Sequence, residues 1–214
     1  STKIIMNIAG TDIDEYIEIL ELMENQSSSI TGYEINISCP NVNKGGMEFG
    51  IDCDMTAKLT EELRSRTDRL IIMKLSPNVS DIVSIGKASQ DSGADAVSAI
   101  NTVVGMSINA NTGKSNIFTT YGGLSGPAIK PIGLAAVNKL YKDLSIPIIG
   151  MGGIVSSTDV AEYILAGSTS VQVGTANFRN PGTGEDLIDM IDTYVAGSNW
   201  KSLVEMIGKV EIHN

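Results

Sequence analysis

Two carboxamides and a thiol stand close together in one short segment of the chain. Asn36, Cys39 and Asn41 follow an alternating run, Tyr33–Ile35, that is typical of a strand. Each carboxamide offers a donor and an acceptor to a flat polar ligand, and a thiol of tuned pKa can exchange a proton. A loop anchored at a strand end holds such groups rigidly and within reach of a ligand. The segment therefore predicts a ligand site with Cys39 as its proton carrier.

The second cysteine, Cys53, is the rival thiol. It precedes Asp54, which the pattern places as the cap of a helix, and a helix start would lower the pKa of Cys53. No polar strand-end group flanks Cys53 in the sequence, so Cys39 is favoured. Two cysteines and one histidine, His213 beside the terminus, indicate neither a disulfide framework nor a structural zinc site. No metal site is expected.

Six apolar, β-rich runs alternate with stretches of helical periodicity. Their nearly unbroken Ile, Val, Met and Ala content is typical of strands buried on both faces of a parallel sheet. The alternation predicts either an open doubly wound sheet or a (β/α)8 barrel. No GxGxxG follows the first run, which disfavours the dinucleotide-binding open sheet. The predicted strands cover residues 3–9, 33–38, 70–75, 96–101, 147–150 and 170–173.

Glycine-rich turns follow the last two predicted strands, at Gly150–Gly153 and at Gly174 with Thr175. A barrel commonly binds phosphate with the loops after its seventh and eighth strands. The six strands would then be strands three to eight. The sequence thus predicts a TIM (β/α)8 barrel that is incomplete, with residues 1–214 forming a single domain truncated at its N-terminus.

Ordinary helix signals lie between the predicted strands. Asp81 can cap one helix, and Pro127 suits the first position of another. Ser156 precedes a third helical stretch, for which Gly167 provides a C-terminal stop. Residues 102–125 break the alternation, because the segment is polar and too long for an ordinary loop between strand and helix. Its Ile, Phe and Thr content indicates a small hairpin or an extended excursion over the strand ends.

Each predicted strand ends in polar or glycine residues. Parallel strands of a barrel end on the same side, so these residues should meet on one face. Lys74 is the clearest case, because a lysine with a buried stem needs an anionic partner. That partner is either a neighbouring carboxylate or a ligand that gains negative charge during reaction. The set is Asn7, Asn36, Lys74, Asn101, Thr102, Gly152, Gly153, Gly174 and Thr175.

Composition limits the partners of the protein. With 214 residues, 42% hydrophobic and 19% charged, the chain should fold as a soluble globule. Its formal net charge of −10 argues against nucleic acid and against an anionic membrane surface. No apolar run reaches the length of about 18 residues that predicts a membrane span, and no signal peptide is recognisable. A cytoplasmic protein is expected.

Taken in order, the motifs resemble those of class 1 dihydroorotate dehydrogenases over nearly the whole chain. The sequence INT followed by GGLSGPAIKP looks more like subclass 1B, the NAD-linked type, than subclass 1A. The matching segments are Asn36–Asn41 (NISCPN), Lys44–Gly50 (KGGMEFG), Lys74–Asp81 (KLSPNVSD), Ile100–Thr102 (INT), Gly122–Pro131 (GGLSGPAIKP), Pro147–Ile154 (PIIGMGGI) and Val173–Phe178 (VGTANF).

The resemblance implies a barrel that holds FMN at its C-terminal face and oxidises dihydroorotate to orotate in pyrimidine biosynthesis. Cys39 would remove the proton at substrate C5 while hydride passes from C6 to flavin N5. The substrate would be bound by Asn36, Asn41, Asn101 and Thr102. The flavin would be bound by Asn7, Asn36, Lys74 and Ile100 at its ring, and by backbone amides around Gly126, Gly152, Gly153, Gly174 and Thr175 at its phosphate.

The resemblance also implies partners. Subclass 1B enzymes work with an iron–sulfur flavoprotein subunit that passes electrons to NAD, and this chain has too few cysteines for a cluster of its own. NAD, FAD and the cluster are thus expected only through that subunit, beside a homodimer. Two alternatives stay open. One is a dihydropyrimidine dehydrogenase-like pyrimidine domain, in which Thr119–Gly123 would match and Cys53 would matter more; the other is a non-catalytic FMN-binding barrel fragment.

Overall fold

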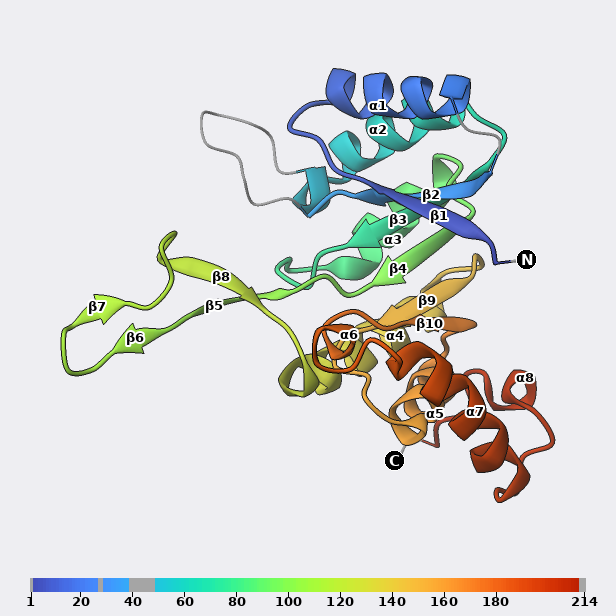
Figure 1. Ribbon diagram of the computed structural model, residues 1–214. Helices are drawn as coiled ribbons and strands as arrows, with labels where there is room; N and C mark the ends of the chain where they lie inside the picture. Colours follow the sequence, from blue (N-terminus) through green and yellow to red (C-terminus); the bar gives the residue numbers. More distant parts are fainter. Residues whose placement is uncertain (1, 27–28, 39–48, 212–214) are drawn as a thin grey trace.

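A sheet of six parallel strands forms the centre of the computed structural model, which describes residues 2–26, 29–38 and 49–211 (Figure 1). The strand order is β1-β2-β3-β4-β9-β10, and every neighbouring pair is parallel. All six predicted strands are confirmed, although β2 begins earlier and β4 ends earlier than expected. The strands are β1 (Ile4–Ile8), β2 (Ile30–Asn36), β3 (Leu70–Leu75), β4 (Ala96–Ala99), β9 (Ile148–Met151) and β10 (Ser170–Gln172).

Helices cover one face of this sheet. Successive long helices pack against one another along the chain, from α1 to α5 and then α7. Among the described residues, no helix is both long and apolar enough to cross a membrane. The helices are α1 (Ile13–Gln26), α2 (Cys53–Arg64), α3 (Ile82–Asp91), α4 (Lys130–Asp143), α5 (Ser157–Ala166), α6 (Ala176–Arg179), α7 (Thr183–Ala196) and α8 (Leu203–Met206), with short 3-10 turns η1 (Phe49–Ile51) and η2 (Pro127–Ile129).

Side-chain alternation along β2 separates the two faces of the sheet. Tyr33 is fully buried, and its hydroxyl donates to Glu24 of α1, so it faces the helices. Because successive side chains of a strand point to opposite faces, Glu34 and Asn36 point to the inner face. Between the sheet and the helices lies an apolar core. It includes Ile71 and Met73 of β3, Val97 of β4 and Leu140 of α4.

The sheet is rolled into part of a barrel. Glu34 on β2 accepts a hydrogen bond of 2.8 Å from Gln172 on β10, although β3, β4 and β9 lie between these strands in the sheet. A flat sheet would hold strands four positions apart at about 19 Å. The inner faces of β2 and β10 must therefore curve toward each other, as in a barrel. The predicted barrel fold is confirmed, with six of its strands present in the described residues.

Most helix signals in the sequence are confirmed. Asp81 caps α3 by accepting from the backbone of Val83 and Ser84, and Ser156 forms a capping box with Asp159 at α5. Pro127 opens the short turn η2 before α4, and Gly167 ends α5 with φ of 125°. The cap predicted at Asp54 is wrong. Asp52 is the N-cap instead, since its carboxylate accepts from the Met55 N–H at 2.9 Å, and this places Asp54 inside the first turn.

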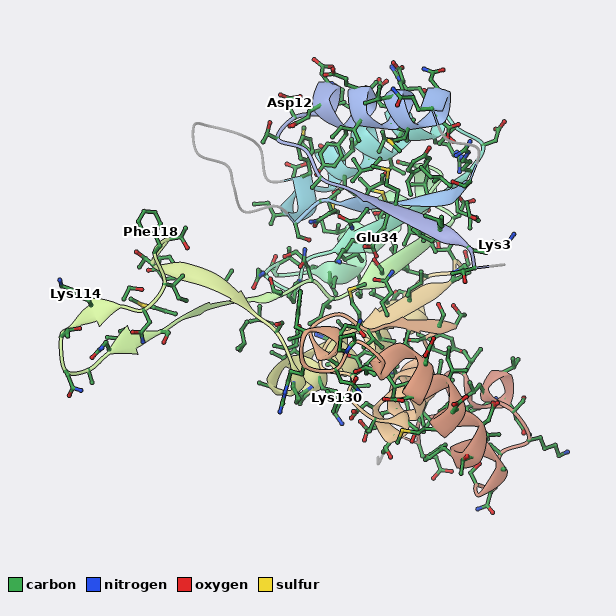
Figure 2. All side chains as sticks on the ribbon, viewed as in Figure 1. Lys3, Asp12, Glu34, Lys114, Phe118 and Lys130 are labelled. Atoms are coloured by element: carbon green, nitrogen blue, oxygen red, sulfur yellow. The ribbon has the colours of Figure 1, made fainter. Side chains whose placement is uncertain are left out.

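Residues 103–124 form a hairpin arm, as the break in the alternation predicted. Strand β5 (Val103–Met106) pairs with β8 (Tyr121–Leu124), and β6 (Ile108–Asn109) pairs with β7 (Lys114–Ser115), both antiparallel. The arm projects away from the barrel (Figure 1), and Lys114 lies at its far end (Figure 2). Phe118, between β7 and β8, is fully exposed.

Candidate active site

The carboxyl ends of the strands meet around one cavity. Parallel strands direct their C-terminal ends to the same side, and loops from four of them contribute to its lining. The segment after the arm and helix α6 supply the remaining wall. The lining includes Lys74 from β3, Ile100, Asn101 and Thr102 after β4, Gly152 and Gly153 after β9, Gln172, Gly174 and Thr175 at β10, and Ser125, Gly126 and Arg179.

The carboxamide of Asn36 contacts that of Asn101, and Asn101 lines this cavity. The Asn101 Nδ2 donates to Asn36 Oδ1 at 3.0 Å, and the Ser38 N–H donates to the same oxygen at 3.2 Å. Tyr16 of α1 fixes the backbone below, because its hydroxyl donates to the Asn36 carbonyl at 2.6 Å. Strands β2 and β4 thus bring two of the predicted substrate-binding amides into contact. Cys39 and Asn41 lie outside the described residues.

Thr102 sits where β4 leads into the arm. Its N–H donates to Asn101 Oδ1 at 2.8 Å. Asn78 clamps this junction, because its Nδ2 donates to the Thr102 carbonyl at 3.0 Å and its Oδ1 accepts from the Val104 N–H at 2.9 Å. The preceding residue, Ile100, is buried and follows a cis peptide bond. The loop that presents Ile100, Asn101 and Thr102 to the cavity is therefore held by the hydrogen bonds of Asn78 and by the burial of Ile100.

Lys74 meets one of the two partners that the sequence left open, a neighbouring carboxylate. Its Nζ lies 3.4 Å from Glu34 Oε2, which is a neighbouring carboxylate, and the same side chain lines the cavity. Sequence reasoning missed Glu34. The one available signal was its parity, since a charged residue two positions before Asn36 in a strand must share the inner face with it.

Asn7 is brought to Glu34 rather than to the cavity lining. Its Nδ2 donates to Glu34 Oε2 at 2.7 Å. Ser98 and Gln172 donate to the other carboxylate oxygen, each at 2.8 Å. These three polar side chains and Lys74 surround one buried carboxylate on the inner face of the sheet.

The glycine turns after β9 and β10 expose their backbone to the part of the cavity that Gly126 also lines. Gly152 and Gly153 have φ of 117° and 74°, in the region that favours glycine. A Cβ on Gly153 would lie 2.8 Å from the Gly126 carbonyl oxygen, so the turn also requires close approach of two backbones. Gly126 and Gly174 face open space. Backbone N–H groups that no side chain shields favour an anion.

A cation and a hydroxyl pair complete this part of the cavity. The Thr175 Oγ1 donates to Ser125 Oγ at 2.8 Å. Arg179, exposed at the end of α6, lines the same cavity. Sequence reasoning missed Arg179, because it lies beyond the strand end and only the folding of α6 returns it to the glycine turns. With Lys74, it is one of the two cationic side chains in the cavity lining.

Cys53 does not fit the role of a reactive thiol. It is the first residue of α2 and does not line the cavity. Burial raises the pKa of the Cys53 thiol, and the carboxylates of Asp52, Asp54 and Asp81 raise that pKa further. The expectation of a lowered pKa is wrong, because burial and these negative charges together raise the pKa of Cys53. Among the described residues, no three His, Cys, Asp or Glu side chains are grouped as metal ligands.

A second hollow lies between β10 and the helices α5, α7 and α8. Its lining is mainly aliphatic, with Ile164, Leu187, Ile191 and Val204 among its residues. Its polar lining is limited to Thr169, Ser170 and Asn177, and the other polar strand ends do not converge on this groove. The cavity at the strand ends is the candidate active site.

Comparison with known proteins shows which proteins this chain is similar to. The family model for dihydroorotate dehydrogenase matches residues 1–195. The chain is 44% identical over 214 residues to the dihydroorotate dehydrogenase B (NAD(+)) catalytic subunit of Porphyromonas gingivalis, covering 100% of this chain and 69% of that protein. It is 44% identical over 211 residues to the subunit of the same name from Desulforamulus reducens, covering 99% and 69%.

A solved structure shares the fold. It is a dihydroorotate dehydrogenase of Eimeria tenella in complex with ferulenol, with a TM-score of 0.74 and 22% sequence identity. The superposed region covers 92% of this chain and 57% of that one, so the chain spans little more than half the length of that structure.

Proposed function

The chain belongs to the dihydroorotate dehydrogenase family, and from this premise we propose that it is the FMN-dependent catalytic subunit of an NAD-linked, subclass 1B enzyme. Its reaction is the oxidation of dihydroorotate to orotate in pyrimidine biosynthesis. The observation that carries the proposal is the convergence of Lys74, Asn101, Thr102 and the glycine turns on one cavity. Relatives named as catalytic subunits at 44% identity support the subclass.

The lining of the cavity supports FMN as its ligand. The exposed backbone around Gly126, Gly153 and Gly174 would hold a phosphate, because a Cβ position at Gly126 or Gly174 meets no atom within 4 Å and leaves the backbone N–H groups open to an anion. Lys74 would provide positive charge to the pyrimidine edge of the flavin, and Ile100 an apolar contact to its ring. Bound FMN would supply the acceptor for the hydride.

The amide pair would bind and orient the substrate. Asn36 and Asn101 can match the alternating N–H and C=O groups of a pyrimidine ring, since each amide has both donors and an acceptor. Thr102, with Asn41, would contact the ring or its carboxylate. Cys39 would remove the C5 proton as general base. Holding the substrate in one orientation is itself a large part of such catalysis.

We further propose a domain organisation, a partner subunit and a cellular location for the protein. Residues 1–214 would form one FMN-binding barrel domain whose strands correspond to strands three to eight of the barrel. The relatives' names as catalytic subunits support a partner subunit. We infer that this partner is an iron–sulfur flavoprotein, that it carries FAD and reduces NAD, and that the catalytic subunit is a cytoplasmic homodimer.

Anaerobic half-reactions test the proposal. The protein is purified as its gene encodes it, and the flavin absorbance is followed after addition of dihydroorotate or dihydrouracil. We expect dihydroorotate to bleach the flavin and dihydrouracil to leave it oxidised. Cys39→Ser should slow bleaching by at least a hundred-fold at neutral pH, because a hydroxyl is a far weaker base than a tuned thiol. Cys53→Ser is the matched control and should bleach at the rate of the wild type.

The same experiment separates the alternatives. Reduction of the flavin by dihydrouracil, together with loss of bleaching in Cys53→Ser, would identify the protein as a dihydropyrimidine dehydrogenase-like pyrimidine reductase. A folded, colourless protein that takes up no FMN would contradict the enzyme altogether. A yellow protein that neither substrate reduces would indicate a binding module without catalysis.

A further inference from the structure

Glu34 is a buried carboxylate to which the proposed function gives no role. It lies on the inner face of β2 and is 5% exposed; Figure 2 shows it among the strands, away from the protein surface. Removing a charged group from water costs several kcal/mol unless it is paired and hydrogen-bonded. The surroundings of Glu34 must therefore be built to accept its charge.

Four donors from four different strands meet this carboxylate. Oε1 accepts from Ser98 Oγ of β4 and Gln172 Nε2 of β10, each at 2.8 Å. Oε2 accepts from Asn7 Nδ2 of β1 at 2.7 Å and lies 3.4 Å from Lys74 Nζ of β3. An ionised carboxylate only accepts hydrogen bonds and has about four acceptor positions. The arrangement matches the ionised form, and Lys74 is its only cationic partner among these four donors.

Lys74 is shared between this carboxylate and the cavity. Its distance of 3.4 Å from Glu34 Oε2 is longer than the 2.7–2.9 Å typical of a tight charge-assisted hydrogen bond. An ammonium group has three donors, so contact with Glu34 leaves donors for a ligand in the cavity that Lys74 lines. A ligand in the cavity beside Lys74 therefore experiences the positive charge of Lys74 together with the negative charge of Glu34.

We propose that Glu34 is a positioning residue that holds Lys74 at the cavity wall and offsets its charge. This inference rests on the proposed function, because it takes the ligand beside Lys74 to be a flavin. Reduction places additional negative charge on the flavin, and a nearby cation favours the reduced form while a nearby anion opposes it. Glu34 and Lys74 together would then set the reduction potential of the bound flavin in opposite directions.

Potential measurements on five variants test this assignment. The complete protein is loaded with FMN, and its two-electron midpoint potential is determined by equilibration with a reference dye. Glu34→Gln removes the negative charge at nearly constant size and should favour reduced flavin about ten-fold, a rise of about 30 mV. Lys74→Met should shift the equilibrium about ten-fold the other way. Glu34→Asp, which restores the charge, should lie within three-fold of the wild type.

The double variant is the decisive member of the set. Glu34→Gln/Lys74→Met removes both charges and should return the potential to within three-fold of the wild type. It also leaves no unpaired buried charge, so it should fold even if Glu34→Gln alone does not. Ser98→Ala removes one neutral donor and serves as the matched control for lost hydrogen bonding. Its thermal stability should fall while its potential stays near that of the wild type.

A purely structural role for Glu34 gives a different pattern. Glu34→Gln would then lose stability without a change in potential, and the double variant would match Lys74→Met. Either result would overturn the inference. A wild-type protein that retains no flavin would instead contradict the proposed function, together with everything that depends on it.

Discussion

Gln172 on β10 donates a hydrogen bond of 2.8 Å to Glu34 on β2, across the inside of the rolled sheet. Through Asn7, Lys74 and Ser98, the same carboxylate also contacts β1, β3 and β4. Five of the six strands of the sheet are thus linked by one side chain. Two of the residues that line the candidate active site, Lys74 and Gln172, are therefore held by this interior polar cluster.

Removal of the Gln172 amide should measure what this link contributes to folding. Gln172→Leu deletes one hydrogen bond to a buried carboxylate, and such bonds to charged groups contribute about 1.5–3 kcal/mol. We expect the free energy of unfolding to fall by about 2 kcal/mol in urea denaturation. Gln90→Leu, at an exposed hydrogen bond to Ser145, is the control and should change it by less than about 0.5 kcal/mol. Equal effects of the two substitutions would contradict the account.

The glycine turns provide a test that separates folding from ligand binding. At Gly153 a Cβ would lie 2.8 Å from the Gly126 carbonyl and φ is 74°, so Gly153→Ala should cost about 2 kcal/mol of stability and at least ten-fold in FMN affinity. Gly174 has open space around its Cβ position. Gly174→Ala should keep the stability of the wild type but bind FMN less tightly, because the methyl group stands where the ligand approaches.

The readouts for these glycine variants are thermal unfolding and titration of the apoprotein with FMN. Gly184→Ala is the control, since its Cβ position is also open and it lies in α7, away from the strand-end cavity. It should leave FMN affinity unchanged. Wild-type affinity in Gly174→Ala would show that this turn does not approach the cofactor.

Arg179 should act on the phosphate of the flavin and not on its ring. Arg179→Met removes a cation from the cavity lining, and we expect the dissociation constant for FMN to rise about ten-fold, equivalent to about 1.4 kcal/mol. The affinity for riboflavin, which lacks the phosphate, should stay within two-fold of the wild type. Lys142→Met at the end of α4 is the control. Equal losses for FMN and riboflavin would place Arg179 elsewhere in the site.

Asp159 should make stability depend on acid pH. Burial alone would raise the pKa of Asp159, but hydrogen bonds from Lys130, the Val155 N–H and Ser156 lower it overall below the ordinary value of 3.8. A carboxyl whose pKa is lower in the folded state stabilises the protein above its unfolded pKa, and this stabilisation disappears as the pH falls through the folded pKa. Lys130, labelled in Figure 2, lies 2.5 Å from Asp159 Oδ1.

Asp159→Asn should therefore lower the free energy of unfolding by about 2 kcal/mol at pH 7, and the difference from the wild type should shrink once the pH falls below about 4. Urea denaturation across this range gives the measurement. Asp143→Asn, at the exposed ion pair with Lys87, should change stability by at most about 1 kcal/mol. A difference for Asp159→Asn that stays constant down to pH 2 would contradict the pKa argument.

The sequence predicted the fold well because local patterns determine it. Unbroken apolar runs identified all six strands, and capping chemistry located the starts of α3 and α5 at Asp81 and Ser156. The cap of α2 was missed because Asp52 and Asp54 are both good capping residues. Only the backbone conformation of Asp52, which is extended, decides between them.

The sequence predicted the site residues at the strand ends, but it did not predict Glu34 inside the barrel or Arg179 on α6. Asn36, Lys74 and Asn101 are visible in the sequence because a polar residue that ends an apolar run is unusual. Glu34 and Arg179 are not visible in this way. Glu34 acquires its role from donors on four other strands, including Gln172, which lies 138 residues away in the chain. Arg179 reaches the cavity only because α6 turns back. Such relationships depend on tertiary packing, which no local pattern encodes.

The central claim is that the polar strand ends form a flavin site, and a crystal structure of the complete protein with FMN tests it most directly. We predict that the phosphate lies within hydrogen-bond distance of the backbone N–H groups of Gly153 and Gly174, with the pyrimidine edge of the ring beside Lys74. Flavin located in the aliphatic groove between α5 and α7, or with its phosphate at Lys74, would contradict the account.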